Sequence, residues 1–222
     1  MIFPSYCTLC NKILLNDELG ICKNCTDKLD HISGNICYRC GQSIEYKGLC
    51  PDCQNSPEPR FWSKRRSLYN YNDAMARLVH EFKYNKNMDL LKYFSIKICE
   101  GYNKYFEENK IDEVIPVPIS KQRKKERGYN QSVKLLKKIE RKIKSNILIR
   151  TRDTKPQSSF KNDKKRVKNI KNAFKVIKDI SGKNLLIVDD ILTTGATLNE
   201  ISRTLYKANA NKIFHLTLIR AR

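Results

Sequence analysis

The sequence lacks any long apolar run and lacks a secretory leader. A helix that crosses a membrane needs about 18 consecutive apolar residues, and no segment of the 222-residue chain reaches that length. The opening residues MIFPSYCTLC contain no basic stretch followed by an apolar one, as a signal peptide requires. These absences predict a cytoplasmic protein that does not insert into membranes. With 40% hydrophobic and 30% charged residues, the chain can form one ordinary globular domain and a smaller one.

Acidic residues are scarce, and the shortage is concentrated in one region. The chain has 23 Asp and Glu against 44 Lys and Arg, a formal net charge of +21. Residues 1–57 are nearly neutral, with five basic and six acidic groups, whereas residues 119–178 hold 22 basic groups and only four acidic ones. Such a concentration of positive charge predicts a polyanionic partner, namely nucleic acid. A general bias toward lysine is the alternative, but it does not explain the neutral N-terminal quarter.

Cysteine is plentiful and regularly spaced. Eight of the nine cysteines form four C-x-x-C pairs before residue 54, and Cys99 stands alone. Residues 7–25 and 37–53 are an imperfect repeat, CTLCNKILLNDELGICKNC and CYRCGQSIEYKGLCPDC. Without a secretion signal, this spacing favours metal binding over disulfides. The predicted metal ligands are Cys7, Cys10, Cys22, Cys25, Cys37, Cys40, Cys50 and Cys53.

Two C-x-x-C turns can surround one tetrahedral ion, so the repeat predicts two zinc ions. Pairing in sequence order matches the repeat. A cross-braced arrangement, in which the first and third pairs share an ion, is the alternative, and iron–sulfur ligation is another. Because sulfur fills every coordination position, the ions are expected to be structural and to supply folding energy. Because four thiolates outweigh one divalent ion, the metal sites make the module of residues 1–57 acidic, so it suits docking of other proteins better than phosphate binding.

Residues 60–222 are predicted to form a second domain, after a short linker stiffened by Pro57 and Pro59. Apolar spacing predicts helices at 73–84, with Asp73 as the cap, at 90–102, at 130–144 and around 198–205. Strands are predicted at 112–118, 146–150, 173–177, 184–190 and 212–220. The alternation of helices and strands predicts an α/β domain with a mainly parallel sheet flanked by helices.

The segment LLIVDDILTTGATLNE, residues 185–200, carries the clearest chemistry in this domain. Asp189 and Asp190 follow a buried strand, where they can accept hydrogen bonds from vicinal hydroxyls or help to hold Mg²⁺. A loop of small and hydroxylated residues then leads into a helix, whose N-terminus favours phosphate. Its residues are Thr193, Thr194, Gly195, Ala196 and Thr197. One loop thus fits both ends of a ribose 5-phosphate.

From Leu185 to Thr197 the chain resembles, position for position, the phosphoribosyl-pyrophosphate signature of type I phosphoribosyltransferases. In that fold a second loop holds pyrophosphate, and the matching segment here is VIPVPISKQRKKERGYNQS. The resemblance implies that Ser120, Arg123 and Arg127 bind pyrophosphate. Hypoxanthine–guanine-type transferases place a further Asp where this chain has Thr193, so no general base for a purine is predicted.

The motifs PVP, RGYNQ and TKPQSSFKNDKKRVKNIKNAF, together with the cysteine-rich N-terminus, resemble the ComF family of competence proteins over nearly the whole chain. Members pair a double zinc ribbon with a phosphoribosyltransferase-like domain and are associated with handling incoming single-stranded DNA during natural transformation. The resemblance implies a ligand-facing loop and a mobile hood segment. The loop residues are Arg127, Gly128, Tyr129, Asn130 and Gln131, and the hood residues are Gln157, Arg166 and Asn169.

The sequence therefore predicts a competence factor that binds phosphoribosyl pyrophosphate with Mg²⁺ and contacts single-stranded DNA. Candidate DNA-binding residues are Lys121, Lys124, Lys125, Tyr129, Lys164, Lys165 and Arg166. Tyr129, Phe160 or Phe174 could stack on bases, with core packing as the alternative for each. The zinc ribbons could dock other DNA-uptake proteins.

Two other functions fit parts of the sequence. One is a metabolic phosphoribosyltransferase acting on a base or an amine, and the other is a zinc-ribbon regulator that reads duplex DNA. The acidic ribbon module argues against the regulator. The sequence supplies no acceptor site, so no residue is assigned to catalysis.

Overall fold

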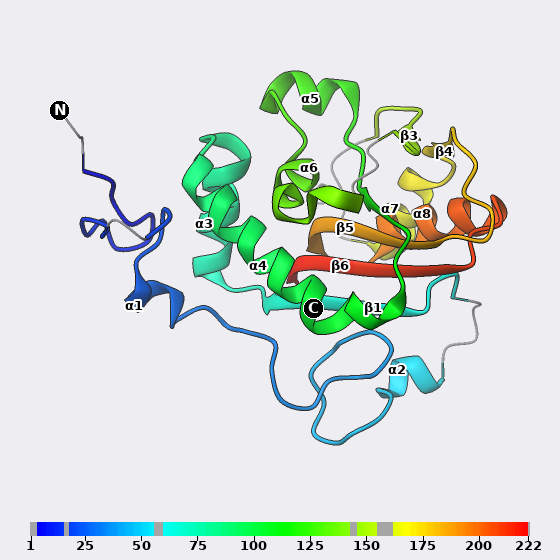
Figure 1. The fold of residues 1–222 in the computed structure, drawn as a ribbon, viewed down its shortest axis with the longest axis horizontal. Coiled ribbons are helices and arrows are strands. Elements are labelled where there is room, and N and C mark those ends of the chain that lie inside the picture. The colour runs from blue at the N-terminus through cyan, green and yellow to red at the C-terminus, as the bar shows by residue number, and fades with distance from the viewer. Residues whose placement is uncertain (1–3, 16–17, 56–59, 143–145, 155–161, 222) are drawn as a thin grey trace.

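The computed structural model describes residues 4–15, 18–55, 60–142, 146–154 and 162–221. Within these ranges, four parallel strands form the main sheet in the order β1-β6-β5-β2 (Figure 1). The strands are β1 (Lys64–Asn70), β2 (Glu113–Pro116), β5 (Asn184–Leu192) and β6 (Lys212–Arg220). Helices α3 (Asp73–Tyr84) and α4 (Met88–Phe106) pack on one face, and α8 (Ala196–Lys207) packs on the other. The predicted parallel α/β fold is confirmed.

The central strand β5 is buried on both faces, as its continuous apolar run predicts. Leu186 and Val188 belong to the apolar cluster that contains α3 and α4, whereas Leu185 and Ile187 belong to the cluster that contains α8. All four side chains have no exposed surface. Since successive side chains of a strand point to opposite faces, this strand joins the two cores.

The predicted amphipathic helices are present, with one change at a cap. Met75, Leu78 and Phe82 of α3 are fully buried, as their spacing predicts. The cap of α3 is Asn72 rather than Asp73, because the Asn72 side chain accepts a hydrogen bond from the backbone N–H of Met75 at 2.9 Å. The prediction that Asp73 caps this helix was therefore wrong by one residue.

The single helix predicted at 130–144 is broken in the structure. It consists of α6 (Gln131–Leu135) and a 3₁₀ segment, η2 (Lys137–Lys142), with non-helical backbone angles at Ile139. Leu135, Leu136 and Ile139, on both sides of this break, all bury their side chains in one cluster.

Two further regions differ from the prediction or were not predicted. The strands β3 (Leu148–Arg150) and β4 (Phe174–Val176) pair antiparallel with each other, apart from the main sheet. The edge strand β1 was not predicted, because its residues KRRSLYN show little apolar alternation. The remaining elements are α1 (Lys23–Thr26), α2 (Pro51–Gln54), η1 (Glu107–Asn109), α5 (Lys121–Arg127) and α7 (Asp163–Ile170).

The two cysteine modules pack at different places on the larger domain (Figure 1). Leu14 and Ile21 of the first module lie in the apolar cluster of α3 and α4. The second module lies along the outer edge of β1, where the backbone N–H of Arg65 donates to the carbonyl of Arg39 at 2.8 Å. This module therefore covers a sheet edge that would otherwise expose unpaired backbone groups.

Within the described part of the chain, no helix combines the length and the apolar character that crossing a membrane requires.

Candidate functional site

The acid pair, Asp189 and Asp190, lies where β5 extends beyond the end of its neighbour β2. β2 ends at Pro116, opposite Val188, whereas β5 continues to Leu192, which pairs with β6 alone. The predicted strand end at residue 190 was therefore two residues too early. Because β2 has already ended, Asp189 and Asp190 lie at the open carboxyl edge of the sheet, the edge at which α/β proteins bind ligands.

The threonine-rich loop follows directly and caps α8. Gly195 has a positive φ of 78°, which a residue with a Cβ adopts at a cost, and Thr194 Oγ1 accepts from the N–H of Ala196 at 3.3 Å. Asp189 and the whole loop line one small cleft. The structure thus brings together Asp189 and all five predicted phosphate-loop residues, at the N-terminus of a twelve-residue helix.

The two carboxylates occupy different environments. Asp189 Oδ1 accepts from Ser132 Oγ at 3.1 Å and from the Asp190 N–H at 3.0 Å, while Asp190 Oδ2 lies 2.7 Å from Lys83 Nζ. Burial, together with the charge of Asp190, raises the pKa of Asp189 to about 7, although Lys83 and the hydrogen bonds oppose the rise. The pair can therefore hold a proton near neutral pH or exchange it for a cation. Carboxylate oxygens are the donors that Mg²⁺ prefers, so the donor set fits this ion.

The end of α3 forms a wall of the site that the sequence did not predict. Phe82 O accepts from the Tyr129 hydroxyl, Lys83 pairs with Asp190, and the Tyr84 hydroxyl accepts from Arg127 Nη2 at 3.4 Å. Three consecutive residues therefore hold the acid pair and the pyrophosphate segment together. Their sequence signal is weak, because a lysine in the last turn of an amphipathic helix is common at any helix C-terminus.

The predicted pyrophosphate residues lie on and beside α5. Ser120 is buried and caps this helix by accepting from the Arg123 N–H at 3.3 Å. Arg127 Nη1 donates to Gln131 Oε1 at 3.1 Å. Arg150 was not predicted, yet its charge interacts with both Arg123 and Asp189, and burial lowers its pKa to about 10. Arg150 thus adds positive charge near both Asp189 and Arg123.

The rest of the RGYNQ motif holds the loop in shape. Gly128 ends α5 with a positive φ of 80°, and Asn130 caps α6 while its side chain donates to the Val117 carbonyl at 2.9 Å. The Tyr129 ring packs partly buried against the core, and Phe174 is 6% exposed. These positions favour the packing alternative over base stacking for both aromatic residues.

The predicted DNA-binding lysines are exposed. Lys121, Lys124 and Lys125 lie on α5, a helix with no buried residue that projects from the body of the protein (Figure 1). Lys164 and Lys165 are exposed on α7, where Arg166 is half-buried. Asn169 lies on the same helix, whereas the predicted residues Gln157 and Phe160 lie outside the described residues.

The eight paired cysteines form two tetrads in sequence order. Cys7, Cys10, Cys22 and Cys25 form one tetrad, and Cys37, Cys40, Cys50 and Cys53 form the other, with all sulfur atoms of a tetrad within 4.8 Å of one another. The sequential pairing is thereby confirmed. Tetrahedral zinc with Zn–S bonds of about 2.3 Å fits such spacing.

Local geometry favours a thiolate at one cysteine of each tetrad. Cys22 N–H donates to Cys7 Sγ at 3.4 Å, and Cys50 N–H donates to Cys37 Sγ at 3.3 Å. Burial opposes ionisation of Cys7 and Cys37, but backbone donors outweigh it and lower the pKa of each thiol to about 6. His31 lies in neither tetrad, and Cys99 is half-buried against the core.

Comparison with known proteins agrees with this geometry. A Double zinc ribbon domain matches residues 1–54, and a Phosphoribosyl transferase domain matches residues 122–222. Fold and site therefore define a protein that joins a double zinc ribbon to a type I phosphoribosyltransferase domain.

The relatives match nearly the whole chain. Competence protein ComFC of Bacillus subtilis (strain 168) is 29% identical over 216 residues, which cover 94% of this chain and 87% of that protein. DNA utilization protein YhgH of Escherichia coli (strain K12) is 28% identical over 93% of each chain. Competence protein ComFC of Streptococcus pneumoniae (strain ATCC BAA-255 / R6) is 28% identical over 94% of this chain and 91% of that protein. Over nearly its whole length the chain thus resembles the ComF family of competence proteins.

Proposed function

We propose that this protein binds phosphoribosyl pyrophosphate, or a related phosphorylated ribose, together with Mg²⁺, and that it handles single-stranded DNA in the cytoplasm during natural transformation. One observation carries the ligand assignment: the acid pair, the glycine-centred phosphate loop and the arginines of the α5 segment meet at one edge of the sheet. This combination offers a group for each charged or hydroxylated part of the ligand.

Each end of the ligand has its own partners in this proposal. The backbone N–H groups and hydroxyls of residues 193–197 bind the 5′-phosphate, aided by the dipole of α8. Asp189 and Asp190 bind the ribose hydroxyls and Mg²⁺, which when bound neutralises charge on the pyrophosphate. Arg123 and Arg127 bind the pyrophosphate oxygens, with Ser120 fixing the start of their helix.

Calorimetric titration of a double variant tests the ligand assignment. Replacing Asp189 and Asp190 together by Ala should abolish binding of phosphoribosyl pyrophosphate in the presence of Mg²⁺. Affinity for a single-stranded oligonucleotide should remain, because the exposed lysines of α5 and α7 are unchanged. Ligand affinity that survives the double substitution would contradict the assignment.

The DNA assignment is supported by charge and by the relatives. The names of the relatives refer to competence and to DNA utilization, and helices α5 and α7 of this chain carry exposed lysines. We further propose that the zinc ribbons contact other DNA-uptake proteins. The ribbons present exposed apolar side chains, among them Tyr6, Ile13 and Tyr38.

A metabolic phosphoribosyltransferase is the alternative function. It predicts turnover with release of pyrophosphate from phosphoribosyl pyrophosphate and a candidate base or amine, and indifference to DNA. The exposed Thr193 stands where purine enzymes place an Asp, so this chain offers no acid–base group for a purine at that position. Pyrophosphate release measured with and without acceptors separates this alternative from a binding function.

A further inference from the structure

Arg65 is a buried charge whose direct partners are neutral. It lies on β1 and is 7% exposed. Its Nε donates to His215 Nδ1 at 3.0 Å, its Nη2 donates to Asn199 Oδ1 at 2.8 Å, and its guanidinium carbon lies 4.2 Å from the centre of the Trp62 ring. Among the residues that the structure describes, no carboxylate pairs with this guanidinium. A buried cation of this kind needs an anion elsewhere to offset its desolvation.

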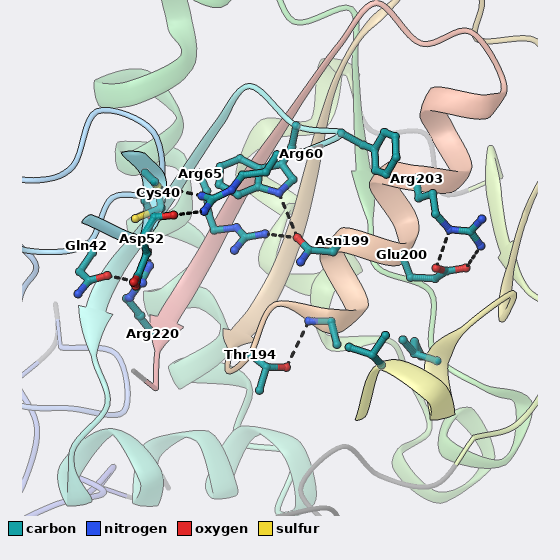
Figure 2. Close-up of a pocket in the computed structure, with 16 residues that line it drawn as sticks. Cys40, Gln42, Asp52, Arg60, Arg65, Thr194, Asn199, Glu200, Arg203 and Arg220 are labelled. Atoms are coloured by element: carbon teal, nitrogen blue, oxygen red, sulfur yellow. Dashed lines mark hydrogen bonds and ion pairs between the residues drawn. The ribbon is translucent and has the colours of Figure 1, made fainter. Parts of the chain in front are cut away.

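The guanidinium supports the back of the phosphate loop. A Cβ on Gly195 would lie 2.9 Å from Arg65 Nη1, so the group packs directly against the loop backbone. Asn199, which accepts from Arg65, also donates its own N–H to the Gly195 carbonyl at 2.8 Å. Figure 2 shows Arg65 pointing toward Asn199 near the start of the helix that Thr194 precedes. Arg65 is therefore placed to fix the loop and to add positive potential behind a bound phosphate.

Arg65 lines the same cavity as Cys40 and Cys53 of the second cysteine tetrad. Arg60 Nη1 donates to Cys53 Sγ at 2.9 Å, and Arg220 Nη1 donates to the Cys40 carbonyl at 3.1 Å. Negative charge on Cys40 and Cys53 acts favourably on the Arg65 charge, against the effects of burial and of Arg220, which lower the Arg65 pKa to about 9. Since four thiolates outweigh one divalent ion, a zinc-loaded tetrad is the anion that this arginine cluster requires. Arg60, Arg65, Arg220 and Cys40 line one cavity between ribbon and helix (Figure 2).

The first tetrad is built differently. Cys10 is exposed, and within the described ranges no arginine donates to a sulfur atom of this tetrad. The first ribbon packs on the α3 and α4 face, whereas the phosphate loop begins α8 on the opposite face. Of the two tetrads, the second lines the cavity that contains Arg65 and Thr194, whereas the first packs on the opposite face of the sheet.

We propose that Arg65 is a positioning residue for the phosphate loop and that the second tetrad, with its zinc, holds Arg65 in place. Affinity for a 5′-phosphate then depends on the second tetrad and not on the first. The inference rests on the proposed function, because it concerns the same phosphate loop.

Titration with ribose 5-phosphate tests the role of Arg65. Arg65→Met should weaken binding about tenfold or more, the size expected when one buried charge near a phosphate is lost. Arg65→Lys keeps the positive charge but loses the planar guanidinium with its fixed N–H donors, so it should bind ribose 5-phosphate more tightly than Arg65→Met does. Binding of Mg²⁺–pyrophosphate, at the other end of the site, should change little in both variants. A purely structural role would weaken both ligands alike and would give no recovery with lysine.

A pair of matched cysteine variants tests the link to zinc. Cys50→Ser and Cys22→Ser each disrupt one tetrad, and the zinc content per chain verifies that each has lost the same amount of metal. Cys50→Ser should weaken ribose 5-phosphate binding as Arg65→Met does, whereas Cys22→Ser should bind like the unmodified protein. Arg60→Ala, which loosens the contact with Cys53 but keeps all zinc ligands, should weaken binding in the same direction if Cys50→Ser does not fold.

The outcomes separate this inference from the proposed function. Failure of the unmodified protein to bind ribose 5-phosphate would overturn both. Normal binding by the unmodified protein together with unchanged affinity in Arg65→Met, or equal losses in the two cysteine variants, would overturn the inference alone.

Discussion

Asp189 sets how the site responds to pH. Its carboxylate is enclosed beside Asp190, which raises its pKa to about 7, and the charged form is the one that binds Mg²⁺. Below this pH the carboxyl is protonated, so ligand affinity should fall as the pH decreases through about 7, approaching tenfold per unit for one proton. Calorimetric titrations with phosphoribosyl pyrophosphate and Mg²⁺ over a pH series measure this dependence.

The ligand's own phosphates also titrate near neutral pH, so the control is Asp189→Asn. This variant should bind weakly at every pH and should retain only the dependence that the ligand contributes. A profile of the unmodified protein with the same shape as that of Asp189→Asn would show that Asp189 does not control binding.

Lys83 tunes the same carboxylate from the end of α3. Its ammonium lies 2.7 Å from Asp190 Oδ2 and lowers the pKa of Asp189. Lys83→Met removes this charge, so the midpoint of the pH profile should move upward, and Lys83→Arg should keep it near that of the unmodified protein. An unchanged midpoint in Lys83→Met would show that the lysine has no electrostatic part in the site.

At the scale of elements, the exposed helix α5 is the simplest test of DNA contact. Contact with about six phosphates of a single strand gives a log–log slope of affinity against salt of about −4. Replacing Lys121, Lys124 and Lys125 together by Gln should reduce the slope by about 2, since each lost phosphate contact removes about 0.7. Fluorescence anisotropy with a labelled single-stranded oligonucleotide measures both slopes.

The matched control replaces two lysines at the far end of the sheet. Lys207 ends α8 and Lys212 begins β6, and both are exposed. Gln at these positions should leave the slope unchanged. Equal reductions in both variants would point to a general charge effect rather than to contact through α5.

Elements with a strong apolar period were predictable, and those stabilised by distant partners were not. Helix α3 and strand β5 follow directly from the spacing of Met75, Leu78 and Phe82 and from the run LLIV. Strand β1 carries Lys64, Arg65 and Arg66, whose burial depends on carbonyl, imidazole and aromatic groups supplied by other segments. No local pattern encodes such partners, so the strand was missed.

The same distinction applies to the site. Asp189, Asp190 and the loop at 193–197 are contiguous, so a spacing motif predicts them together. Lys83 and Ser132 reach the acid pair from α3 and α6, elements far away in sequence that only the folded chain brings to this edge.

At the scale of the whole molecule, the ribbons are part of the fold rather than appendages. Cys7 and Cys25 lie in the apolar cluster on the α3 face of the sheet, and Cys37 and Cys53 lie in the cluster on the α8 face. Each zinc site therefore supports one of the two cores. Only the second tetrad lies in the cluster that contains α8, the helix that begins at the phosphate loop.

The central claim is that one protein couples a phosphoribosyl ligand to single-stranded DNA. Calorimetric titration of the zinc-loaded protein with phosphoribosyl pyrophosphate and Mg²⁺, with and without a short single-stranded oligonucleotide, tests it most directly. Our account predicts binding of the ligand and an affinity that changes when the oligonucleotide is present, because α5 carries both the arginines proposed to bind pyrophosphate and the lysines proposed to bind DNA. Binding that is indifferent to the oligonucleotide would favour a metabolic transferase, and absence of ligand binding would contradict the account.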